Sequence, residues 1–242
     1  MADSAPVTPN EVTFAYTFAF GDGSVRRFAV RLDYETLGMI APARTELPAW
    51  TELSFCKCPN CPLDEALHPR CPIAANLVEV VDVFKDSISY EEVDVSVEAH
   101  GRTYVKRTSL QQGVSSLIGI FMVTSGCPIL NRLRPMVDTH LPFMNADEST
   151  YRMISTYLTA QFFRHKAGKP ADWEMKDLLR FLSECRETNT AFCRRLQTLG
   201  VRDASLNAMS ILNAMGEITS LSIETFDMSR WERIFQSNLG SA

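Results

Sequence analysis

Four of the seven cysteines in this 242-residue chain fall in one short segment, with the spacing of metal ligands. The segment reads CKCPNC from Cys56 to Cys61 and HPRC from His68 to Cys71. Two thiolates separated by two residues can bind one ion through a tight turn, and the prolines stiffen the loop so that binding costs less entropy. The spacing leaves two tetrahedral sets open for Zn²⁺: Cys58, Cys61 and Cys71 are common to both, and either His68 or Cys56 is the fourth ligand.

Two other interpretations of this cysteine-rich loop stay open. Four thiolates, several of them before proline, also form the ligand set of an iron–sulfur cluster, which here would use Cys56, Cys58, Cys61 and Cys71. The same thiols could instead be reduced and packed in a rigid turn, although Pro, Lys and Asn are not the apolar neighbours that usually bury a structural thiol. A structural metal would make its binding energy a part of the folding energy.

Outside the loop, Cys127 is the candidate for a reactive thiol. It precedes Pro128, so we expect it at a helix N-terminus, where the helix dipole lowers the pKa of a thiol. With Arg132, Arg134 and His140 it could form a polar pocket and a Cys–His pair, the minimum for thiol catalysis. The alternatives are a small buried cap for Cys127 and a hydrogen bond at a helix end for His140.

No catalytic residue is assigned, because the chain has no nucleophile elbow, phosphate-binding glycine loop or His-Glu-x-x-His motif. The net charge of −5 argues against nucleic acid as a partner, which would need a basic face. The mostly apolar part of the longest uncharged stretch covers about ten residues (114–123), whereas a membrane span needs about 20. The N-terminus lacks a secretory pattern, so we expect a cytoplasmic protein, in which clustered thiols favour ligands over disulfides.

The elements that position these residues are predicted as an α+β fold. Alternating apolar residues predict two β-hairpins, with turns at Gly21–Ser24 and at His100–Gly101. Together they make a four-stranded antiparallel sheet, and the apolar spacing from Ile73 to Phe84 predicts a helix that covers its buried face.

The chain after residue 107 is predicted to be helical. Helices are expected over about 109–125, from Cys127, from Asn145 with a capping box to Glu148, after Asp172 and over about 204–221. The predicted organisation is a sheet region over 1–107, with the metal loop at 56–71, and a helical region over 108–242 packed on it as one unit. The apolar C-terminal helices would supply the seam of a homodimer.

Six motifs then follow one another along the chain: CPNCPL, HPRCP, TSLQQG, SGCP, LRPM and HLPF, which begin at Cys58, His68, Thr108, Ser125, Leu133 and His140. Together they resemble a family of uncharacterised bacterial proteins that is known only as a domain of unknown function. The resemblance implies a bacterial cytosolic protein and favours Cys58, Cys61, His68 and Cys71 as the ligand set, but it implies no activity.

The function predicted from the sequence is a metal-binding protein of regulatory or interaction type, with structural zinc as the cofactor and an unidentified protein as the partner. The alternative is a redox or iron–sulfur protein that uses the loop from Cys56 to Cys71, Cys127, or both.

Overall fold

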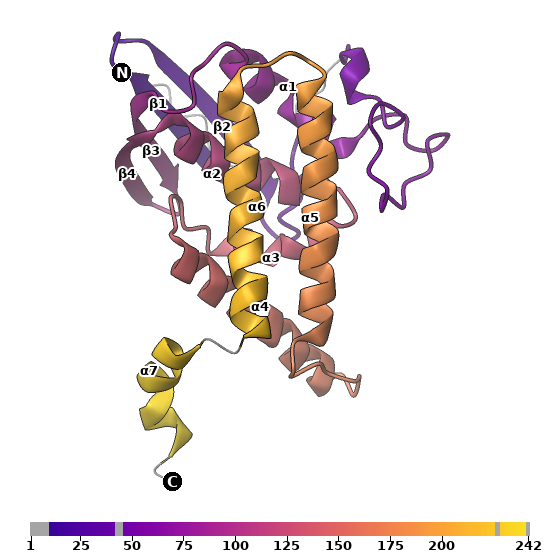
Figure 1. Cartoon of the computed structure of the whole chain (residues 1–242), viewed down its shortest axis with the longest axis vertical. Coiled ribbons are helices and arrows are strands. Elements are labelled where there is room, and N and C mark those ends of the chain that lie inside the picture. Colours follow the sequence, from indigo (N-terminus) through magenta and orange to yellow (C-terminus); the bar gives the residue numbers. More distant parts are fainter. Residues whose placement is uncertain (1–9, 42–45, 226–227, 241–242) are drawn as a thin grey trace. The chain divides into compact units, whose positions relative to one another are not determined.

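The computed structural model describes residues 10–41, 46–225 and 228–240, and a four-stranded antiparallel sheet occupies its N-terminal part (Figure 1). β1 (Glu11–Phe20) and β2 (Val25–Asp33) form one hairpin, and β3 (Glu92–Ala99) and β4 (Arg102–Ser109) form the other. β1 also pairs with β3, so the strand order is β2-β1-β3-β4. With a mostly helical C-terminal half, this confirms the predicted α+β fold.

Local sequence explains the hairpins. Phe14, Tyr16 and Phe18 alternate along β1 and are fully buried, which directs one face of the sheet to the core. The second hairpin turns through His100 and Gly101, both with positive φ (51° and 70°), as a two-residue turn with the twist of the flanking strands requires.

Two helices pack on the buried face of the sheet. α1 (Pro72–Phe84) brings the Phe84 ring within 5.2 Å of the Phe18 ring, centroid to centroid. α2 (Leu110–Thr124) approaches so closely that a Cβ added to Gly113 would lie 2.8 Å from the Phe18 ring and 2.9 Å from Val95. The glycine is therefore what allows α2 to lie against β1 and β3.

We expect Gly113→Ala to destabilise the protein, because overpacking of a core costs about 1–3 kcal/mol and the gain in helix propensity returns only about 1 kcal/mol. Gly119→Ala on the same helix is the matched control, since its added Cβ would lie 3.5 Å from Leu212, an ordinary contact. Urea unfolding midpoints measure both variants. A lower midpoint for Gly113→Ala with an unchanged or higher one for Gly119→Ala is the expected pair of results, and equal midpoints would contradict the close packing.

The remaining helices are η1 (Ala49–Thr51), η2 (Leu130–Leu133), α3 (Pro135–Asp138), α4 (Ala146–Lys166), α5 (Lys176–Gln197), α6 (Asp203–Glu224) and α7 (Ser229–Leu239). The predicted capping box at the start of α4 is present, because Asn145 and Glu148 exchange side-chain to backbone hydrogen bonds of 2.9 and 2.8 Å. Asp172 accepts a bond from the backbone N–H of Asp177 at 2.7 Å, in the first turn of α5.

Two elements differ from the prediction. The helix expected from Cys127 is replaced by a turn, the 3-10 helix η2 and the four-residue α3, because Pro135 cannot donate the backbone hydrogen bond that a continuing helix would need. α7 is not among the expected helices.

The chain divides into two compact units, and neither of them is one continuous stretch of sequence. The first unit comprises Met1–Phe143 and Glu187–Leu212, and the second comprises Met144–Arg186 and Asn213–Ala242. α2 packs on the sheet and belongs to the same unit, while α5 and α6 each contribute one end to each unit.

The second unit is held together by α4, α6 and α7. The hydroxyls of Thr150 and Thr219 lie 3.1 Å apart, and the Tyr151 ring contacts Trp231 and Phe235 of α7. This unit has exposed apolar side chains, such as Leu239. The homodimer through the C-terminal helices stays a prediction. None of the helices in the described residues is long and apolar enough to cross a membrane.

Candidate metal centre

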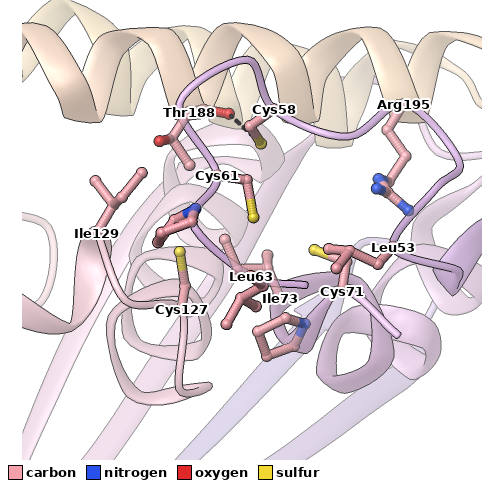
Figure 2. A pocket seen from close by; sticks show the side chains of 12 residues that line it. Leu53, Cys58, Cys61, Leu63, Cys71, Ile73, Cys127, Ile129, Thr188 and Arg195 are labelled. Carbon is pink, nitrogen blue, oxygen red and sulfur yellow. Dashed lines mark hydrogen bonds between the residues drawn. The ribbon is translucent and has the colours of Figure 1, made fainter. Parts of the chain in front are cut away.

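Four thiols from three separate segments of the first unit line one cavity (Figure 2). Cys58 and Cys61 come from the loop before α1, Cys71 comes from the start of α1, and Cys127 comes from the turn that follows α2. Figure 2 shows their sulfur atoms directed into the space between these segments. None of the seven cysteines, all of which the structure describes, forms a disulfide.

The loop is closed at its base, which places its two thiols above α1. The backbone N–H of Leu53 donates to the carbonyl of Pro69 at 2.9 Å, and that of Cys71 donates to Thr51 at 2.8 Å. Within the loop, the N–H of Cys61 donates to the carbonyl of Cys58 at 3.0 Å. This tight turn is the local structure that lets a Cys-x-x-Cys pair face one point.

Cys71 and Cys127 hold the opposite side of the cavity and are both buried. Cys71 is the N-cap of α1, directly before a proline at the first helical position, and is 7% exposed. Cys127 is 8% exposed and follows Gly126, whose φ of 95° turns the chain back after α2. Backbone N–H groups of Leu130 and Ile129 donate toward the Cys127 thiol.

α5 covers the loop from one side and contacts it through two residues that lie two turns apart. The Cys58 thiol is 3.9 Å from the carbonyl of Thr188, and the Thr188 hydroxyl donates to Asn60 at 3.3 Å. Arg195 donates from Nη1 to the carbonyls of Trp50 and Glu52, at 2.6 and 2.7 Å. The loop is therefore fixed at its base and along one side.

Burial dominates the electrostatics of the Cys58 thiol. It raises the pKa of Cys58 to about 12, with smaller increases from Cys71, Cys61 and Cys127 and a decrease from Arg195. Each neighbouring thiol raises this pKa because a second thiolate nearby would repel the first. A nearby cation would therefore favour ionisation of the Cys58 thiol.

Burial also raises the pKa of Cys127, and the backbone N–H groups of Leu130 and Ile129 offset only a part of this rise. The direction is opposite to the one expected from the sequence, because Cys127 is buried and precedes a turn rather than the first turn of an α-helix. As an unliganded thiol it is therefore less ionised than an exposed cysteine at neutral pH.

The other two ligands considered from the sequence lie elsewhere on the loop. His68 and Cys56 are both exposed, and neither belongs to the lining of the cavity. The backbone N–H of His68 donates to the carbonyl of Asp64 at 2.8 Å, which turns this part of the loop back on itself. The structure thus brings together three of the predicted ligands and adds Cys127 to them.

The polar pocket expected around Cys127 has a different arrangement. His140 Nε2 lies 2.8 Å from the hydroxyl of Tyr16, which is also 2.9 Å from the hydroxyl of Ser116. Arg134 donates to the carbonyl of Thr36 at 3.1 Å. Among the described residues that line the thiol cavity, Arg132, Arg134 and His140 are absent.

The described residues include no group of three or more His, Cys, Asp or Glu side chains already arranged as metal ligands. A bound ion would therefore require the thiols to turn toward a common point. The signal for Cys127 in the sequence was its place before a proline, a feature that it shares with Cys58, Cys61 and Cys71. That signal says nothing about distance, so spacing alone did not connect Cys127 to the loop.

One comparison with known proteins identifies a family for the chain, and none adds an activity. A family model described as "Domain of unknown function (DUF6901)" matches residues 14–236, which is most of the chain. No curated protein and no solved structure matches it.

Proposed function

Because the chain belongs to the family described as Domain of unknown function (DUF6901), a description that names no activity, we propose a function from the site itself. The protein binds one zinc ion through the thiolates of Cys58, Cys61, Cys71 and Cys127. The observation that carries the proposal is that four thiols from three separate segments face one cavity. Cys127 is distant in the sequence from the other three cysteines, so its place in the same cavity supports a shared role as a ligand.

The ligand chemistry favours zinc in a structural role. Zn²⁺ takes four thiolates in a tetrahedron, and a closed four-thiolate set keeps no open position for water or substrate. Cys58 and Cys61 supply two ligands from one turn, whereas Cys71 and Cys127 supply one each from α1 and from the turn after α2. A bound ion would therefore link the loop to α1 and to the turn after α2, which belong to the first unit.

The biological role that we propose is regulatory or interacting, in a reducing compartment such as the bacterial cytoplasm. Ordering of the loop by a metal would present its outer part in one conformation. That part carries the exposed side chains of Leu67 and His68, with Leu67 76% exposed. An exposed apolar residue on a rigid loop is suited to recognition of a protein partner.

Elemental analysis of protein purified without oxygen tests the metal. We expect about one zinc per chain, a colourless preparation and, after replacement by Co²⁺, the absorption spectrum of tetrahedral cobalt with thiolate ligands. Iron with acid-labile sulfide in a brown preparation would support the iron–sulfur alternative and overturn zinc. Protein that carries no metal and takes up neither Zn²⁺ nor Co²⁺ would overturn metal binding altogether.

A further inference from the structure

The side chain of Arg195 is buried beside the four thiols and is 1% exposed. Its guanidinium donates to two backbone carbonyls and lies 5.7 Å from the centre of the Phe55 ring. These contacts orient the group, and the carbonyls and the ring face supply partial negative charge. They do not supply the full negative charge that a buried cation requires.

No carboxylate among the residues that the structure describes forms an ion pair with Arg195. Arg195 bonds to the backbone carbonyl of Glu52, but the Glu52 carboxylate lies 3.7 Å from Arg70 instead. An arginine remains charged at all relevant pH values, so it cannot avoid the cost of burial by losing its proton. A buried arginine without a carboxylate partner therefore indicates a different anion.

We propose that this anion is the metal centre and that Arg195 is its built-in counter-charge, an inference that rests on the proposed function. Four thiolates around Zn²⁺ carry a formal excess of two negative charges. Arg195 lines the same cavity as the thiols and offsets one of those charges. Arg195 would balance charge and position the site, and it would not be a ligand of the metal.

The geometry gives this pairing a second effect. Arg195 lies on α5, while the two carbonyls that it contacts belong to Trp50 and Glu52, which precede the loop. Loading of the metal would thus strengthen the attachment of α5 to the base of the loop, because the arginine gains an anionic partner in a site with little water.

Two substitutions separate charge from hydrogen bonding. Arg195→Gln keeps amide donors for the carbonyls but removes the charge, whereas Arg195→Lys keeps the charge and loses the planar fork. The matched control is Arg194→Gln, which removes the same charge from the neighbouring, exposed position on α5. Zinc affinity is measured for the full-length protein by competition with a chromophoric chelator, together with the zinc-to-chain ratio.

We expect Arg195→Gln to weaken zinc binding roughly tenfold or more, since one nearby charge in a poorly solvated site is worth at least about 1.4 kcal/mol. Arg195→Lys should retain most of the affinity, and Arg194→Gln should match the wild type. Equal affinities for Arg195→Gln and the wild type, or equal losses for Gln and Lys, would overturn the charge assignment and leave zinc binding intact. Failure of both variants to fold would assign Arg195 a purely structural role and also overturn the inference. A wild-type protein that binds no zinc would instead refute the proposed function.

Discussion

Replacement of Cys127 by serine is expected to abolish stoichiometric zinc binding, whereas replacement of His68 by alanine leaves it intact. Cys127 is buried and lines the cavity with the other thiols, while His68 is exposed outside it. Changes around a metal ligand already cost about 10–100-fold in affinity, so loss of a ligand itself should cost at least about a hundredfold. The measurement is the zinc-to-chain ratio after dialysis against a weak chelator.

The controls separate loss of a ligand from loss of a cysteine. Cys193→Ser alters a half-buried thiol that does not line the cavity, and Cys56→Ser alters an exposed thiol of the loop itself. Both variants should retain about one zinc per chain. If instead His68→Ala loses the metal and Cys127→Ser keeps it, the ligand set confined to the loop is correct and the four-thiolate set is wrong.

Removal of the metal is expected to lower the stability of the first unit strongly. At a free zinc concentration a thousandfold above the dissociation constant, binding contributes about 4 kcal/mol to the free energy of unfolding. For a chain of this size, 1 kcal/mol corresponds to about 2–4 °C. Chelation by EDTA under reducing conditions should therefore lower the melting temperature by about 8–16 °C, as measured by circular dichroism.

Hydrogen exchange shows whether the loss occurs at the proposed site. Protection should fall at the loop over residues 56–71, at the start of α1 and in the turn at residues 125–130, because these segments carry the four thiols. Protection of α4 in the second unit should remain, and re-addition of Zn²⁺ should restore the rest. An unchanged melting temperature, or a loss spread evenly over both units, would contradict a structural metal at this place.

The parts of the fold that could be predicted are those that neighbouring residues specify. The alternation of Phe14, Tyr16 and Phe18 identifies a strand with one buried face, and two consecutive residues with positive φ at His100 and Gly101 close its counterpart hairpin. Asn145 and Glu148 form the capping box of α4 from a spacing of three residues. Each of these features depends on interactions within one turn or one strand pair.

The C-terminal part was harder to predict because its elements depend on packing. η2 and α3 replace a longer helix where Pro135 interrupts the pattern, and α7 carries its apolar residues on a short helix whose main partner is Tyr151 of α4. Amino-acid composition also does not indicate the boundary between the two units. It depends on tertiary packing, because α5 and α6 each contribute one end to each unit.

By itself, the sequence determined the two hairpins and the cysteine pair Cys58 and Cys61, because short-range spacing and turn chemistry specify them, whereas the pairing of β1 with β3 that joins the hairpins is long-range. Only the tertiary structure decided that Cys127, rather than His68, faces the other thiols, and that Arg195 lies buried beside them. The physical reason is that these residues are brought to the cavity by α2 and α5. The positions of those helices are set by packing against the sheet and the loop, which no local pattern contains.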